Sequence, residues 1–371
     1  MKVAMIGLRG IPAKSGGVEH VVENLAPRLV KLGAEVTVFC RTPYCKDRPE
    51  EYKGVKLKYL PTINTKHLEA ITHTKLATFN SMFKDYDLIH YHAMGNAIFS
   101  FLPRLAGKKT IVTLHGLDYQ REKWGKLATL YLKFCEKVIK HFPNHVISVS
   151  KKIKDHYIKK FGKEIEFIPN GVELNKPKKL VKLRKFLIRK NNYILFLSRI
   201  VPEKNVDLLI NAFKKINTDL KLVIVGDATH TDEYMKKCKD LAKRDNRIIF
   251  TGPLYDEDKF EAFSNARFFV LPSTIEGMPI VLLEAMSFGL CPLVSDIKEN
   301  ADVIEGKYGF TFKSNDEKDL IKQLKTLINN PKKTAQVGKL CKTMVEKHYQ
   351  WDAVAKQTFE LYEKALTSKK N

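Results

Sequence analysis

The chain has 371 residues, of which 44% are hydrophobic and 29% are charged, the composition of a globular protein with room for two domains. Lysine and arginine outnumber aspartate and glutamate by 65 to 41, so the formal net charge is +24. A disordered chain and an integral membrane protein are both excluded, because no stretch approaches the roughly 18 apolar residues of a membrane span.

Strand-length apolar runs alternate with helical patterns through the first half of the chain. The expected strands are Lys2–Ile6, Glu35–Cys40, Leu88–His92, Thr110–Leu114 and His145–Val149, with a helix at Val18–Leu32 between the first two. Strands separated by helices predict a parallel sheet covered by helices. The first residues show neither the apolar region nor the cleavage site of a secretory signal, so we expect a cytoplasmic location.

The alternation restarts after a basic connector, Lys176–Lys190, in which 8 of 15 residues are basic and none is acidic. The expected strands are Tyr193–Leu197, Leu222–Val225, Ile248–Phe250, Phe268–Leu271 and Pro292–Val294, and the expected helices are Val206–Ile216, Asp232–Arg244, Asp256–Asn265 and Ile280–Phe288. The pattern predicts an α/β protein of two doubly wound domains in series. Ligands of such pairs lie in the cleft between the domains, over the carboxyl ends of the strands.

A glycine-rich turn, residues 7–17, joins the first expected strand to the first helix. Glycines such as Gly16 and Gly17 let backbone amides approach a phosphate or a sugar at the start of a helix. The turn matches neither G-x-G-x-x-G nor the P-loop motif, and the second strand ends in Arg41 rather than in an acidic residue that would hold a ribose. Nicotinamide binding is therefore disfavoured, and a turn needed only for packing is the alternative.

Three histidines lie at or near strand ends of the first half. His115 directly follows an expected strand and so belongs at the carboxyl edge of the sheet, where it either contacts a ligand or only caps the turn. His90 and His92 alternate along one strand and therefore share a face. Because no third ligand lies nearby in the sequence, we interpret this pair as structural rather than as a metal site.

Charged residues of the second half gather in two strand-to-helix turns. Arg199 and Lys204 follow the first strand of this half, and two cations at this spacing suit a diphosphate. Glu276 lies in the turn after the fourth strand, Pro279 suits the first position of the next helix, and Glu284 lies within that apolar helix. A carboxylate in so apolar a helix needs a partner or a ligand. The alternative is one exposed and one ion-paired glutamate.

These residues together resemble the retaining GT-B glycosyltransferases of family 4. Glu276 and Glu284 match the E-x7-E signature of that family, and Arg199 and Lys204 match its R-x4-K pair. Residues 7–19 and 115–125 resemble the branch of the family that contains polysaccharide rhamnosyltransferases. Residues 168–172 resemble the link between its two domains. The resemblance covers nearly the whole chain and implies the GT-B fold, in which two Rossmann-like domains face a central cleft.

The resemblance also implies a division of labour. Residues 1–170 would form the acceptor-side domain, with a C-terminal helix at about 350–371 that packs back on it, and residues 171–349 would bind the donor. The reaction would move a sugar from a nucleoside diphosphate sugar to a glycan or lipid-linked saccharide in the synthesis of cell-surface polysaccharide or glycoconjugate. An epimerase on the same fold is the enzymatic alternative, although the E-x7-E and R-x4-K residues favour transfer.

On the donor side, the resemblance implies that Glu284 accepts hydrogen bonds from the nucleotide ribose and that Glu276 contacts hydroxyls of the transferred sugar. Arg199 and Lys204 would stabilise the departing nucleoside diphosphate, an electrostatic role that needs no metal. The backbone that faces the donor would be that of Gly277, Met278, Pro279 and Ile280.

On the acceptor side, the resemblance implies that His115 and the loop with Gly16 and Gly17 hold the sugar and the acceptor. The acceptor would attack from the face that the diphosphate leaves, and a phosphate oxygen would take its proton. This chemistry requires neither a side-chain nucleophile nor a cofactor.

Metal binding is not expected. Two Asp-x-Asp sequences, at 85–87 and 256–258, look like the metal motif of the other main glycosyltransferase fold. The first precedes an expected strand, and the second begins an expected helix, where acidic residues favour the helix dipole. The six cysteines are scattered and form no zinc pattern with the histidines, so we expect reduced thiols.

The basic surplus favours an anionic partner, and solubility alone is the alternative explanation. Residues 1–170 hold 29 basic and 15 acidic side chains and the remainder hold 36 and 26, so the charge is diffuse and nucleic-acid binding is only a remote alternative. Residues 121–142 combine six basic side chains with apolar ones. Such a helix either binds an anionic membrane at the inner face of the cell or packs on the sheet like any surface helix.

Overall fold

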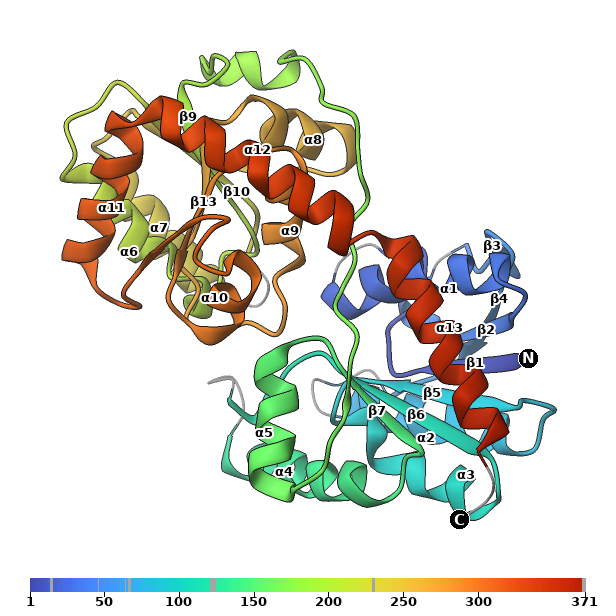
Figure 1. Ribbon diagram of the computed structural model, residues 1–371. Coiled ribbons are helices and arrows are strands. Elements are labelled where there is room, and N and C mark those ends of the chain that lie inside the picture. The colour runs from blue at the N-terminus through green and yellow to red at the C-terminus, as the bar shows by residue number, and fades with distance from the viewer. Residues whose placement is uncertain are drawn as a thin grey trace. The chain divides into compact units, whose positions relative to one another are not determined.

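The computed structural model of the protein describes residues 1–13, 16–45, 47–63, 65, 68–120, 125–228 and 231–368. The chain folds into two compact α/β units (Figure 1). Unit 1 comprises Met1–Gly171 together with Trp351–Asn371, and unit 2 comprises Val172–Gln350. Two doubly wound α/β domains, the fold class predicted from the sequence, are thereby confirmed.

Unit 1 has an eight-stranded sheet in the order β3-β4-β2-β1-β5-β6-β7-β8, in which only the β3–β4 pair is antiparallel. Its strands are β1 (Lys2–Ile6), β2 (Glu35–Arg41), β3 (Glu51–Tyr52), β4 (Val55–Leu60), β5 (Leu88–His92), β6 (Lys109–Leu114), β7 (His145–Ser148) and β8 (Glu166–Phe167). Its helices are α1 (Gly17–Lys31), α2 (Leu68–Met82), α3 (Phe101–Leu105), α4 (Lys126–His141), α5 (Lys151–Phe161) and α13 (Trp351–Thr367), with 3-10 turns at η1 (Thr42–Tyr44), η2 (Asn96–Ser100) and η3 (Asp118–Gln120).

Helices cover both faces of this sheet. Residues of α2, α4 and α5 share one buried cluster with Ile89 and Tyr91 of β5. His90, between them in the strand, points to the opposite face and is hydrogen-bonded through Nδ1 to Tyr362 of α13 at 2.6 Å. The last helix of the chain is therefore part of unit 1, where it also packs against α1.

Unit 2 has a six-stranded parallel sheet in the order β11-β10-β9-β12-β13-β14. Its strands are β9 (Tyr193–Leu197), β10 (Lys221–Val225), β11 (Ile248–Gly252), β12 (Phe268–Leu271), β13 (Pro292–Ser295) and β14 (Phe310–Phe312). Its helices are α6 (Val206–Lys214), α7 (Asp232–Ala242), α8 (Asp256–Asn265), α9 (Ile280–Ser287), α10 (Lys298–Ile304), α11 (Glu317–Asn329) and α12 (Pro331–His348), with 3-10 turns at η4 (Lys182–Phe186) and η5 (Pro202–Lys204).

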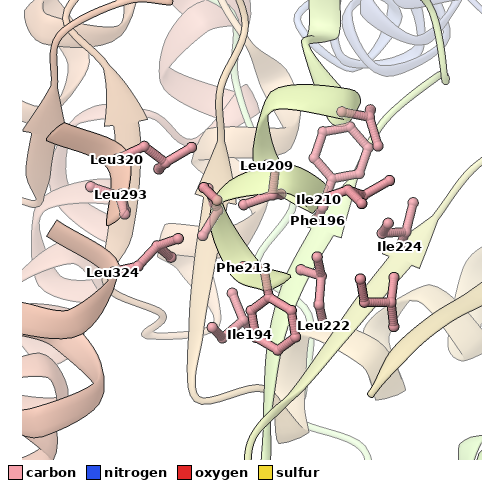
Figure 2. Close-up of a cluster of buried hydrophobic side chains, with 14 of the residues drawn as sticks. Ile194, Phe196, Leu209, Ile210, Phe213, Leu222, Ile224, Leu293, Leu320 and Leu324 are labelled. Atoms are coloured by element: carbon pink, nitrogen blue, oxygen red, sulfur yellow. The ribbon is translucent and has the colours of Figure 1, made fainter. Parts of the chain in front are cut away.

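The core of unit 2 follows from strand alternation. Figure 2 shows Leu209, Ile210 and Phe213 of α6 over Phe196 of β9 and Leu222 of β10, and α11 contributes to the same buried cluster. The opposite face of the sheet is covered by α8, because the ring of Phe263 lies 6.3 Å from that of Phe269, a residue that alternates with this cluster along β12. Phe263 also stacks on Phe288 at the end of α9, so α8 and α9 are neighbours.

Both sheets have a topological switch point. In unit 2 the chain runs from β9 to β10 and β11, and then returns to the other side of β9 with β12, β13 and β14. In unit 1, β1 and β5 are the corresponding pair. Loops that leave two such strands diverge and open a crevice at the carboxyl edge of the sheet. The candidate residues of each unit lie in or next to these loops.

Most predicted elements are present, and β1, β5, β9, β12 and α8 have the predicted bounds. The strands β3, β4, β8 and β14 were not predicted. Three of them span only two or three residues, whereas β4 carries alternating lysine and apolar residues, a strand signal that the sequence does contain. Pro279 caps α9 rather than occupying its first position, because the helix begins at Ile280.

The basic connector forms only the short turn η4. It is held on α8 by a buried carboxylate, Glu261, which accepts hydrogen bonds from the backbone amides of Val181, Lys182 and Leu183 at 2.8 to 3.2 Å. Of the expected basic helix at 121–142, α4 is described, whereas residues 121–124 lie outside the described part of the chain. No helix in that part is long and apolar enough to cross a membrane.

Candidate active site

The loops that follow β9 and β12 meet at the switch point of unit 2. The backbone amide of Thr274 donates a 2.9 Å hydrogen bond to the carbonyl of Glu203, which fixes the η5 turn against the loop after β12. Next to it, the Lys204 ammonium and the Glu276 carboxylate form an ion pair whose side chains are only 10% and 9% exposed. In such a shielded pair, removal of either charge leaves the other buried without a partner, which lowers the stability of the fold.

Arg199 stands two residues beyond β9 and is exposed. Its loop is fixed by the neighbouring residue Ile200, whose amide donates to the carbonyl of Asp227 at 2.9 Å and whose carbonyl accepts from Thr231 Oγ1 at 2.9 Å. Gly226, at the end of β10, has a φ of +145°, and a Cβ there would come within 1.8 Å of the Ser198 carbonyl oxygen. Only glycine allows this close approach, so the end of β10 fixes the loop that carries Arg199.

Glu284 has a partner that the sequence did not predict. Lys259 of α8 donates to its carboxylate at 2.7 Å, and both side chains remain partly exposed. Glu276 and Glu284 are thus each ion-paired, which rules out the alternative of one exposed and one paired glutamate. Lys259 lies 25 positions upstream on another helix, and no spacing rule links such positions; only the packing of α8 beside α9 brings them together.

The N-terminus of α9 follows Glu276 closely in the sequence. Pro279 caps the helix and accepts a 3.0 Å hydrogen bond from the amide of Leu282, and Met278 and Pro279 are buried. Gly277 precedes them and is half-buried. The first amides of a helix have no partner within it and carry the positive end of the helix dipole. Ile280 supplies the first of these amides.

The glycine-rich turn of unit 1 is tied to α1 by two carboxylates. Glu19 accepts from the amide of Arg9 at 3.0 Å, and Glu23 accepts from the amide of Ala13 at 3.1 Å. Gly16 has a φ of +102° and lies against Glu19, whereas a Cβ at Gly17 would meet nothing within 4 Å. A phosphate on the Arg9 and Ala13 amides is therefore disfavoured, because the carboxylates already occupy them, and the open side of Gly17 suits a sugar hydroxyl better.

His115 lies at the end of β6, half-buried, with its Nε2 3.2 Å from Nδ1 of His92. Burial keeps His92 neutral, since it holds the pKa of the imidazole well below 6.5. Burial also lowers the pKa of His90 to about 3, and both of its ring nitrogens are hydrogen-bonded, to Tyr362 and to Thr113 Oγ1. His90 is therefore structural, as the sequence predicted, whereas His92 contacts a candidate site residue.

The residues that resembled metal motifs have structural roles. In the first Asp-x-Asp sequence, Asp85 pairs with the Lys2 ammonium at 2.6 Å and Asp87 accepts from the Lys2 amide at 2.7 Å. In the second, Glu257 and Asp258 pair with lysines of the basic connector. No group of three or more His, Cys, Asp or Glu side chains among the described residues is arranged to hold a metal, and all six cysteines are free thiols.

Comparisons with known proteins show the family of the chain. The family model for glycosyl transferases group 1 matches residues 180–350, and that for Glycosyltransferase Family 4 matches residues 15–176. O-antigen chain mannosyltransferase C of Escherichia coli is 26% identical over 100% of both chains. An N-acetylgalactosaminyltransferase of Campylobacter jejuni, whose name specifies a diphospho-undecaprenol-linked sugar, is 24% identical over 86% of this chain and 88% of its own.

The fold is also that of solved glycosyltransferase structures. Anabaena HepE, solved in complex with UDP and with UDP-glucose, superposes with a TM-score of 0.81 at 20% identity, covering 98% of this chain and 100% of the other. Unit 1 carries the family 4 match and unit 2 carries the group 1 match, so that together they take in most of the chain. The chain belongs to the group 1 and family 4 glycosyltransferases, enzymes with the GT-B fold.

Proposed function

We propose that this glycosyltransferase is a retaining enzyme that moves a hexosyl group from a nucleoside diphosphate sugar to a glycan or a lipid-linked saccharide. The observation that carries the proposal is the shielded Lys204–Glu276 pair at the switch point of unit 2, next in sequence to the N-terminus of α9. The UDP complexes of HepE and the diphospho-undecaprenol in the name of the C. jejuni relative support the classes of donor and acceptor.

The pair provides two functions from one contact. Without donor, Glu276 compensates the Lys204 charge. With donor, the carboxylate would accept hydrogen bonds from sugar hydroxyls, and the ammonium would be directed to the diphosphate together with exposed Arg199. Preorganised positive charge where negative charge develops is worth about 10²–10³ in rate for one group. No side-chain nucleophile is needed if a phosphate oxygen takes the acceptor proton.

Unit 1 would supply the acceptor side. His115 would contact the sugar through the edge of its ring that does not face His92, and Gly16 and Gly17 would border the same site. A cytoplasmic location follows from this proposal, because nucleoside diphosphate sugars are made in that compartment. The proposed domain roles are thus those implied by the resemblance: unit 1, which includes the C-terminal helix, would bind the acceptor, and unit 2 would bind the donor.

The direct test measures release of free nucleoside diphosphate with and without acceptor. A panel of nucleoside diphosphates and nucleotide sugars first identifies the donor by thermal shift, since a ligand at 100 times its Kd stabilises the protein by about 2.7 kcal/mol. Acceptor-dependent release supports transfer. Release without any acceptor, accompanied by a free sugar epimer, would assign an epimerase instead.

Replacing Glu284 by glutamine should weaken binding of the nucleoside diphosphate by about 10- to 100-fold, because a hydrogen bond to a charged group contributes about 1.5–3 kcal/mol. Titration calorimetry with the nucleotide identified above measures the Kd. Lys259→Met is the matched control, since it removes the ion pair but leaves the carboxylate in place. An unchanged Kd in Glu284→Gln would remove this residue from the nucleotide site.

Sugar transfer should persist in excess chelator at its full rate. The leaving charge is met by two cations and a helix N-terminus, so the proposed mechanism routes no step through a metal. The measurement is initial rate before and after dialysis against a chelator. Inactivation that magnesium or manganese reverses would contradict the mechanism.

A further inference from the structure

The outer surface of α4 is unusual for a helix that covers a sheet. Its inner side is buried through Leu132 and Ile139, as expected of any such helix. Three large apolar side chains point to solvent instead: Leu127 is 85% exposed, Leu130 67% and Phe134 56%. Packing on the sheet therefore does not explain these three apolar residues of α4.

Lysines line the edge of this exposed apolar stripe. Lys126, Lys133 and Lys137 are all exposed, and at about 100° per residue they share an arc of about 40° beside the stripe. Within α4, all of which the structure describes, the one acidic residue is Glu136, which is buried. Its carboxylate is paired with His156 at 2.7 Å and with Lys160 at 2.5 Å. The outer surface of α4 is thus apolar and cationic, and α4 itself adds no exposed acidic side chain to it.

Helix α2, on the same face of the sheet, also exposes apolar side chains. It shares a buried cluster with α4, and both helices pack against η2. Leu76, Phe79 and the following Phe83 are exposed, and together with Leu60 they line a shallow groove of about 470 Å³. Two helices on one face of the sheet therefore both present large apolar side chains to solvent.

We infer that the α4 face, defined by Leu127, Leu130 and Phe134 with Lys126, Lys133 and Lys137, binds the surface of an anionic lipid bilayer. Apolar tips that enter the headgroup region beside lysines that meet lipid phosphates are the features of an interfacial helix. A second copy of the chain fits less well, because a symmetric dimer would place these lysines opposite one another on two chains of charge +24. A bilayer complements both the charge and the apolar stripe.

This inference deepens the proposed function, because a lipid-linked acceptor would be met at the surface that α4 binds. The two can fail separately. Vesicle binding is measured without donor or acceptor, and sugar transfer is measured on a water-soluble acceptor without vesicles. Absence of vesicle binding would therefore not contradict sugar transfer, and absence of transfer would not contradict vesicle binding.

The test is sedimentation of the full chain with vesicles of phosphatidylcholine alone or mixed with phosphatidylglycerol. We expect binding to the anionic vesicles that weakens as salt is raised. Replacing Lys126, Lys133 and Lys137 by glutamine should weaken binding by about 100-fold, because each lysine near an anionic surface contributes about fivefold. Replacing Leu127, Leu130 and Phe134 by serine should weaken it by about tenfold or more.

A matched control is the serine triple variant of three apolar residues that are exposed to a similar degree in unit 2: Val181, Leu187 and Leu340. This control should bind vesicles like the wild type, and single Lys→Gln variants of α4 should each lose a few-fold. Binding that is equal for neutral and anionic vesicles, or lost in the control but kept in the α4 variants, would overturn the inference. So would concentration-dependent dimerisation that the serine variant of α4 abolishes while no vesicle binding occurs.

Discussion

Replacing Glu276 by glutamine should lower the rate of sugar transfer by about 10³-fold while unit 2 stays folded. Glutamine keeps an oxygen that can accept a hydrogen bond from Lys204 but loses the charge that the sugar hydroxyls and the ammonium both use. Alanine is a poorer test, because it would leave a nearly buried lysine without a partner, a loss of about 3–5 kcal/mol in stability. Because of the ion pair, the glutamine variant rather than the alanine variant separates an effect on catalysis from an effect on folding.

The matched control is Glu203→Gln. Glu203 lies next to Lys204 in the η5 turn, and its backbone carbonyl, which a side-chain change does not remove, accepts the hydrogen bond from Thr274. The control removes a carboxylate charge from the η5 turn, beside Lys204, and should turn over at nearly the wild-type rate. Thermal unfolding of both variants establishes that the fold is kept. Equal rates for Glu276→Gln and the wild type would place Glu276 outside the reaction.

A double variant distinguishes a shared role from two separate ones. If Lys204 and Glu276 act as one unit on the donor, Lys204→Met combined with Glu276→Gln should be about as slow as the slower single variant. If they act on different parts of the donor, the two losses should multiply. We expect a combined loss that exceeds the slower single variant, because the proposal assigns the carboxylate to the sugar and the ammonium to the diphosphate. It should fall short of the full product, because each single variant also leaves the other charge without its partner.

Most elements and their order could be predicted because each helix or strand has its own pattern of apolar and polar residues. Strands such as β9 and β12 are apolar runs of four or five residues, and α8 begins with three acidic residues, so each can be predicted without knowledge of its neighbours. Strands as short as β8 and β14 depend on pairing with a longer neighbour and have no period of their own. They could not be predicted for that reason.

The site divides in the same way. The positions of Arg199, Lys204 and Glu276 at strand ends are local, and their placement in neighbouring loops follows once the strand order is known. The partners are not local. Glu284 meets Lys259 from another helix, and amides of the glycine-rich turn meet Glu19 and Glu23 from α1. Such contacts are set by how helices pack on the sheet, which no spacing in one sequence records.

Acid should unfold unit 1 well before the carboxylates of the protein are titrated. Burial lowers the pKa of His90 to about 3 and that of His73 to about 4, where the charge of Arg41 adds to the effect, and it holds the pKa of His92 well below 6.5. In the unfolded chain these side chains take up protons below pH 6.5. The folded state cannot bind those protons, so its full stability is present above pH 6.5 and is lost as the pH falls toward 4.

The expected slope is about 1.4 kcal/mol per pH unit for each of the three histidines, or about 4 kcal/mol per pH unit together. A domain has about 5–15 kcal/mol of stability in total, so two pH units suffice to consume most of it. His90 bridges Thr113 of β6 and Tyr362 of α13, and its protonation would remove an acceptor from this bridge. The C-terminal helix should therefore separate from the sheet in the same transition.

Trp351 reports on that transition, because it lies buried at the start of α13 and is one of only two tryptophans in the chain. In a Trp124→Phe background its fluorescence follows urea unfolding of unit 1 at a series of pH values.

His73→Leu should reduce the dependence of the unfolding free energy on pH by about 1.4 kcal/mol per pH unit between pH 6 and pH 4.5. The exposed His141 provides the control, and His141→Gln should leave the slope unchanged. Identical slopes in the wild type and in His73→Leu would show that the imidazole of His73 does not resist protonation, and would remove this residue as a cause of acid unfolding.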